Sequence, residues 1–196
     1  QVLNESHPDM AISYNNIGTI YYSRGVYELA LDYYQKALEI RKQVFGDTHL
    51  DVAMSYNNIG MIYRSKGNYD LALEYDHQAL AIQKRMLGES HPIVASSYNN
   101  IGMTHRFNGA YDLAAEYCQQ ALTIQKQLFG ESHLDVAMSY NNIGTIHYYK
   151  EDYDLLESIN EEGQLVEPTQ DRPIIPAVRC RQAIGLAPGY RFSRMS

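Results

Sequence analysis

A block of 42 residues recurs along this chain. The five-residue run at 14–18 returns at 56–60, 98–102 and 140–144. Each block opens with a histidine: His7, His49, His91 and His133. Self-similarity at a fixed period of this length is typical of a stack of small structural units, each in contact with its neighbours. The sequence therefore predicts a repeat protein before any single element is assigned.

The sequence of each block predicts two helices. In the first copy, apolar and small residues lie three or four positions apart over 11–21 and again over 27–38, and Gly25 separates the two runs. Gly46 follows the second run, where a residue in the left-handed conformation commonly ends a helix. The pattern predicts antiparallel helix pairs and an all-α fold.

The beginning of the first helix also repeats. A hydroxyl and a carboxylate lie three positions apart in three copies, as Ser6 and Asp9, Thr48 and Asp51, and Ser132 and Asp135. This spacing resembles a capping box, in which a hydroxyl accepts a hydrogen bond from the first turn of the helix. The third copy has Ile93 in place of the aspartate, which predicts a weaker cap there.

Small residues recur where the two helices of a block must cross. They are Gly18, Gly60, Gly102 and Gly144 on the first helix, and Ala30, Ala72 and Ala114 on the second. Glycine inside a helix costs about 1 kcal/mol relative to alanine, so its recurrence indicates close packing that offsets this cost. Asp76 stands where the first copy has Tyr34, which predicts either local loosening or a polar contact between repeats.

The pattern resembles the tetratricopeptide repeat over residues 6 to about 155. The residues that carry this resemblance are Tyr14, Ile17, Gly18, Tyr21, Gly25, Tyr27, Ala30, Tyr34, Ala37 and Leu38. The 42-residue length, the His-Pro or His-Leu linker and the Asn-Asn pair are similar to the kinesin light chain variety. The resemblance implies a right-handed superhelical solenoid of antiparallel helix pairs.

The register predicts the organisation of the chain. Residues 1–5 match the end of a preceding repeat, followed by repeats at 6–47, 48–89, 90–131 and 132–166, and by a tail at 167–196. The second helix of the last repeat, expected over about 151 to 166, has Leu156, Asn160 and Gly163 at packing positions and is therefore degenerate. Four prolines in the tail oppose a long helix there.

Composition favours a cytoplasmic location. The net charge is -7, and the sequence shows neither a signal peptide nor an apolar run of about 18 residues. The two cysteines, Cys118 and Cys180, form no disulfide framework, which fits a reducing compartment. The negative charge disfavours nucleic acid as a main partner.

Catalytic and metal-binding patterns are absent from the sequence. It contains no phosphate-binding glycine loop, no nucleophile elbow and no zinc-binding His-Glu-x-x-His pair. The leading histidines of successive blocks are separated by helix layers, roughly 10 Å or more, whereas zinc ligands lie about 2.0 to 2.1 Å from the ion. We expect no enzyme activity and no cofactor.

The resemblance implies a binding groove lined by the first helix of each repeat. The residues that it assigns to the groove are Asn15, Asn57, Asn99, Asn141, Met61, Arg64, Met103 and Arg106. Asparagine amides match the alternating donors and acceptors of an extended peptide. Methionine offers an adaptable apolar contact, and arginine pairs with carboxylates. These residues predict a peptide ligand with an apolar anchor and acidic flanks.

The adjacent asparagines of each block cannot both face the groove, because neighbouring helical residues point about 100 degrees apart. We expect the ladder of Asn16, Asn58, Asn100 and Asn142 to bond neighbouring helices. The favoured function is a non-enzymatic adaptor that binds extended peptides in the groove, as kinesin light chains bind cargo. A self-associating scaffold, or an accessory array of a larger enzyme or signalling protein, is the alternative.

Overall fold

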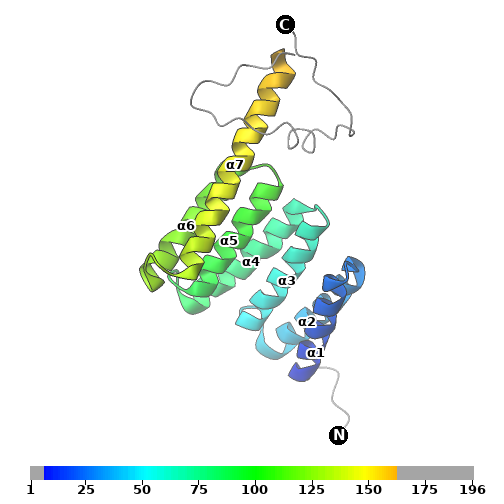
Figure 1. Ribbon diagram of the computed structural model, residues 1–196. Coiled ribbons are helices and arrows are strands. Elements are labelled where there is room, and N and C mark those ends of the chain that lie inside the picture. Colours follow the sequence, from blue (N-terminus) through cyan, green and yellow to red (C-terminus); the bar gives the residue numbers. More distant parts are fainter. Residues whose placement is uncertain (1–6, 163–196) are drawn as a thin grey trace. The chain divides into compact units, whose positions relative to one another are not determined.

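The computed structural model describes residues 7–162, with side chains up to residue 151. The predicted segments 1–5 and 167–196 therefore lie outside the described residues. The chain divides into two compact units, Gln1–His147 and Tyr148–Ser196. The described residues form helices α1 (Pro8–Ser23), α2 (Tyr27–Phe45), α3 (Leu50–Ser65), α4 (Tyr69–Leu87), α5 (Pro92–Phe107), α6 (Tyr111–Phe129) and α7 (Leu134–Glu162) (Figure 1).

The first unit is a row of helix pairs. Within each of the first three blocks the two helices pack against each other, and the second helix of a block packs on the first helix of the next (Figure 1). The described residues contain no strand. This arrangement confirms the predicted all-α array of helix pairs. Among these helices, none combines the length and apolar character that crossing a lipid bilayer requires.

Glycine produces both kinds of turn in the array. Gly25, Gly67 and Gly109 separate the two helices of a pair, with φ of +73°, +76° and +77°. Gly46, Gly88 and Gly130 follow the second helix, with φ of 79°, 81° and 77°. Residues with a Cβ rarely adopt such angles, so these positions determine where the chain reverses. The glycines predicted to end helices are thereby confirmed.

The capping residue at the start of each first helix is histidine. His7, His49 and His91 are the N-cap residues of α1, α3 and α5. In all four blocks the histidine Nδ1 accepts a hydrogen bond of 3.2 Å from the backbone N–H two residues later. The expected capping box was wrong, because the imidazole takes the place of the hydroxyl. The Ile93 N–H is capped like the others, but the first turn of α5 has no acidic residue, so the weaker cap there stays a prediction.

Close helix crossings form the core of each pair. A Cβ added to Gly18 would lie 2.8 Å from the Tyr34 ring, and one added to Gly102 would lie 2.6 Å from Cys118 Sγ. The second helix also packs on the first helix of the next block. Ala30 and Tyr34 of α2, for example, contact buried isoleucines of α3. Small residues therefore permit the crossing that the sequence predicted.

The last block departs from this plan. The expected second helix over about 151 to 166 is wrong in its start, because α7 continues without a break from Leu134 to Glu162. The position that matches Gly25, Gly67 and Gly109 is Glu151. A helix continues where no residue favours the left-handed turn, which explains the difference. The boundaries proposed for the repeats stay a prediction.

Candidate interaction surface

The first helices α1, α3, α5 and α7 share one polar surface, here called the amide face. It is defined by the column Asn15, Asn57, Asn99 and Asn141. The first three are half-buried and Asn141 is exposed. The histidine caps and the 42-residue period place these amides at the same position of each helix. The face is therefore a repeated feature of the array.

Amide groups on this face also connect neighbouring repeats. Asn58 Nδ2 donates to Asn15 Oδ1 over 2.8 Å, and Asn99 Nδ2 donates to Ser139 Oγ over 3.2 Å. The structure thus brings together the two asparagine columns that we expected to have separate roles. Asn57 Oδ1 and Asn99 Oδ1 are buried and have no hydrogen-bond partner among the described residues. Part of each amide is therefore inaccessible to a ligand.

Arg64 lies at the junction of the second and third blocks. Its Nη1 donates to the backbone oxygen of Asn100 over 3.2 Å and to Thr104 Oγ1 over 3.1 Å. The same Nη1 lies 3.8 Å from Asp76 Oδ2, and the Arg64 side chain is 18% exposed. This guanidinium is thus already engaged by groups of the array. Its predicted role in ligand binding stays a prediction.

Asp76 forms the polar contact between repeats that was one of two expectations for this position. Thr104 Oγ1 donates to Asp76 Oδ2 over 3.2 Å, from α5 to α4. Burial is the main cause that raises the pKa of Asp76 to about 6, while Arg64 and the hydrogen bond from Thr104 lower it. The equivalent residues Tyr34 and Cys118 are buried without a charge. Asp76 therefore gives this junction a polarity that the others lack.

The other predicted groove residues are partly covered. Met61 and Met103 are half-buried on α3 and α5. Arg106 is also half-buried, and its guanidinium carbon lies 4.5 Å from the centroid of the Phe107 ring. These side chains therefore contribute to packing as well as to the surface.

The predicted groove residues do not include an apolar column that lies beside the amides. Ile12, Met54 and Met138 lie three residues before the asparagines, and they are 54%, 42% and 56% exposed. Ser96 takes this position in the third block. The signal in the sequence is an apolar residue repeated at a position whose neighbours three and four residues later are both asparagine. These exposed side chains are the apolar part of the amide face that a ligand could cover.

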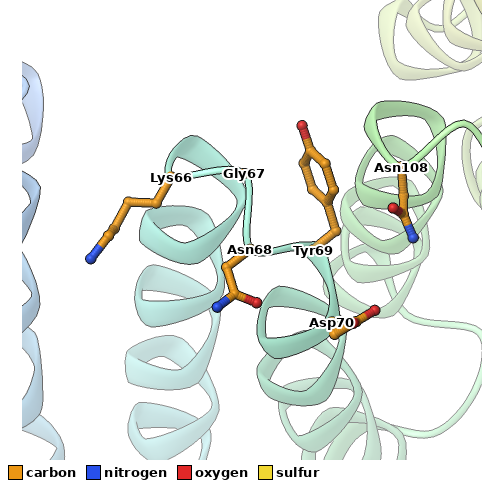
Figure 2. Close-up of a pocket in the computed structure, with 6 residues that line it drawn as sticks. All are labelled: Lys66, Gly67, Asn68, Tyr69, Asp70 and Asn108. Carbon is orange, nitrogen blue, oxygen red and sulfur yellow. The ribbon is translucent and has the colours of Figure 1, made fainter.

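A polar cavity of about 320 Å³ lies at the turns of the second and third blocks. Lys66, Gly67, Asn68, Tyr69 and Asp70 come from the turn between α3 and α4, and Asn108 comes from the next turn (Figure 2). Figure 2 shows Lys66 pointing away from Asp70 and Asn108, consistent with its 2.7 Å ion pair to Glu28. Asn68 Oδ1 caps α4. These groups mainly stabilise the turn.

Two titratable side chains outside the predicted groove, His105 and Cys118, are buried by helix packing. No group of three or more potential metal ligands occurs among residues of the described part. His105 stacks on Tyr117 with 5.3 Å between ring centroids, and burial lowers the pKa of this histidine. Burial also raises the pKa of Cys118 to about 11, as expected for a packed thiol.

The comparison with protein families decides the classification. The tetratricopeptide repeat model matches three overlapping stretches, residues 9–85, 51–117 and 93–155. The chain belongs to the tetratricopeptide repeat family. No curated protein sequence matches this tetratricopeptide repeat chain significantly.

Solved tetratricopeptide-type structures share the fold. BtubC (BKLC) from P. vanneervenii is 25% identical with a TM-score of 0.67, covering 97% of this chain and 71% of that one. A Podosopora anserina protein described as a kinesin light chain, with nearly identical tetratricopeptide-like repeats, is 20% identical with a TM-score of 0.65, covering 91% and 89%. The predicted likeness to kinesin light chain repeats is confirmed at the level of the fold.

Proposed function

We propose that this chain is a non-catalytic adaptor that binds an extended segment of a partner protein along the amide face. Tetratricopeptide repeat arrays are protein-interaction scaffolds, and proteins of this family are generally non-catalytic. The observation that supports a particular surface is the exposed column of Ile12, Met54 and Met138 beside the asparagine amides. Apolar and amide groups on one repeated face match the side chains and the backbone of a peptide.

The apolar column supplies the affinity in this proposal. Complete burial of a side chain of this size stabilises a complex by about 1.5 to 3 kcal/mol. Each block offers one such contact or, in the third, Ser96. A ligand that spans several blocks therefore gains from several modest contacts on a surface that is already formed.

The ligand that we propose carries apolar anchors rather than a dense acidic cluster. Arg64 donates to Asn100 and Thr104 and lies beside Asp76, so one partner carboxylate is already present within the array. A ligand carboxylate has to compete with these groups for the guanidinium. Apolar contacts to Ile12 and Met54 need no such exchange.

Selection from a displayed library of random 12-residue peptides tests this proposal. The selected peptides are measured by fluorescence anisotropy against the full chain and against a Met54→Asp variant. Met86→Asp is the matched control, because Met86 is 49% exposed but lies on the second helix α4. Met54→Asp is expected to weaken binding at least tenfold, about 1.4 kcal/mol, while Met86→Asp leaves it unchanged.

Two results oppose the proposal. One is a set of selected peptides that bind both variants as well as the unchanged chain, which places their site elsewhere. The other is an equal loss in the two variants, which indicates that a general change in surface charge is responsible. Circular dichroism of both variants establishes that their helical content is unchanged.

A further inference from the structure

Among the residues that the structure describes, no helix covers the face of α7 that corresponds to the faces covered by α2, α4 and α6 in the other blocks. We call it the open face and define it by Ala137, Tyr140, Gly144 and His147, all of which are exposed. Tyr140 is 51% exposed, whereas its equivalents Tyr56 and Tyr98 are buried. A Cβ added to Gly144 would meet nothing within 4 Å. The face has the residues of a helix crossing without the second helix.

The array itself shows what kind of helix fits this face. The covering helices α2, α4 and α6 share the pattern Ala-x2-Tyr-x3-Ala, as Ala30-Tyr33-Ala37, Ala72-Tyr75-Ala79 and Ala114-Tyr117-Ala121. All six alanines are buried. The shared tyrosine lies beside the first-helix aromatics, with Tyr75 stacked on Tyr63 over 5.5 Å between centroids. The alanines allow close approach, and the tyrosine fills the space between them.

Glycine on the first helix completes the fit. The backbone oxygen of Ala114 lies 3.0 Å from a Cβ added to Gly102, so that crossing admits only a hydrogen there. Gly144 keeps the same residue at the open face. In the last block, however, the sequence has Leu156, Ile159 and Gly163 at the three positions of the Ala-x2-Tyr-x3-Ala pattern. The fourth block therefore retains the glycine of the first helix but lacks the two alanines and the tyrosine that pack against it in the other blocks.

We propose that the open face of α7 is a docking site for a helix of a partner protein that carries Ala-x2-Tyr-x3-Ala. This surface differs from the amide face, and the proposal does not depend on peptide binding there. A second copy of this chain is a poor occupant, because its described helices with this pattern, α2, α4 and α6, already bury their alanines. A partner with a free helix of this chemistry meets no such competition.

A peptide with the α6 sequence, residues 111–129, is the probe. A hydrocarbon link between positions 119 and 123, which are exposed on α6, holds it in a helix, since short isolated helices are marginal in water. The control peptide carries Ala114→Leu and Ala121→Leu. Fluorescence anisotropy with the full chain is expected to show micromolar binding of the probe and binding at least tenfold weaker for the control.

Gly144→Leu is the matched change on the protein. Its side chain meets no atom of the chain near the Cβ, so thermal unfolding is expected to stay at or above that of the unchanged protein, while probe binding falls at least tenfold. Met54→Asp, on the amide face, is expected to leave probe binding unchanged. These two variants separate a failure of this proposal from a failure of the proposed function.

Three outcomes overturn the docking site. Undetectable binding of the probe shows that the face does not accept this helix. Equal binding to the Gly144→Leu variant places the probe elsewhere on the array. A dimer in light scattering that Gly144→Leu abolishes shows that a second copy occupies the face instead.

Discussion

The first helices of the third and fourth blocks share the residues of the helix crossing but have different surroundings. α5 packs against α6 and buries Ala95, Tyr98 and Gly102. The equivalent residues of α7 are exposed. The sequence of the first helix is thus compatible with both states. What differs is the residue that follows it, a glycine at 109 and a glutamate at 151.

From this difference we infer that two features of the sequence favour the packing of a second helix on the first. The chain must reverse, which requires a residue that adopts positive φ, as Gly109 does at +77°. The second helix must also present small residues at the crossing, as Ala114 does. The sequence of the fourth block meets neither condition, although Gly144 retains the small residue of the first helix.

The largest expected effect is the pH dependence of stability caused by Asp76, which is buried between the packed helices of the second and third blocks. Burial raises the pKa of Asp76 from 3.8 to about 6, so between these pH values the folded chain holds a proton that the unfolded chain has lost. The contribution of Asp76 to stability therefore falls as pH rises from about 4 to about 6 and levels off above it. We expect the difference in free energy of unfolding between the wild type and Asp76→Asn to change by about 3 kcal/mol over this window.

Urea unfolding followed by circular dichroism at several pH values measures this change. Asp70→Asn is the control, because Asp70 is an exposed aspartate on the same helix. Its difference from the wild type is expected to remain within about 0.5 kcal/mol across the window. A flat profile for the Asp76→Asn difference would contradict the role that we assign to burial.

The next prediction compares Gly102, which lies at a helix crossing, with Gly144, which has no helix against it among the described residues. Gly102→Ala places a Cβ 2.6 Å from Cys118 Sγ and 3.0 Å from the backbone oxygen of Ala114, so the helices must separate. We expect a net loss of about 1 to 2 kcal/mol, because overpacking exceeds the gain in helix propensity. Gly144→Ala meets nothing and is expected to stabilise α7 by about 1 kcal/mol. Urea unfolding gives both values, and effects of the same sign would refute the difference in packing.

Alanine substitutions at Gly109 and at the equivalent Glu151 are expected to show the same kind of contrast in stability, with smaller effects. Gly109→Ala forces a residue with a Cβ into φ of +77°, which costs about 1 to 2 kcal/mol, partly offset by a less flexible unfolded chain. Glu151→Ala lies within a continuous helix and is expected to change stability by less than about 0.5 kcal/mol. Thermal unfolding of the two variants measures the contrast. A costly Glu151→Ala substitution would indicate a contact that the helix alone does not require.

Sequence was sufficient for the packed blocks because their signals agree. Gly25 and Gly46 indicated the turns, and Gly18 with Ala30 indicated the crossing, so helix period and turn chemistry gave the same answer. The polar contact of Asp76 was also among the expectations. The continuous α7 was missed, although Glu151 at the position of the turn glycine was the available signal.

Sequence was less informative about the candidate surface. Arg64 is engaged by Asn100 and Thr104, which lie 36 and 40 residues away and approach it only when the blocks stack. Periodicity cannot reveal such partners, because the equivalents of Thr104 are isoleucines in the other blocks. The exposure of Met54 likewise depends on which neighbours cover it. A column on one helix face is visible in the sequence, but its accessibility is set by stacking.

The smallest expected effect tests whether the fourth block begins like the others. His49 and His133 accept the same 3.2 Å hydrogen bond, from the backbone N–H groups of Asp51 and Asp135. Replacing either histidine by alanine removes this acceptor and should cost about 0.5 to 1 kcal/mol of helix stability. Amide hydrogen exchange in the first turns is expected to accelerate by about two- to fivefold in both variants. The two accelerations are expected to be similar because the hydrogen bond is local. A much larger acceleration in α7 than in α3 would show that the second helix of a block also stabilises the first turn of α3.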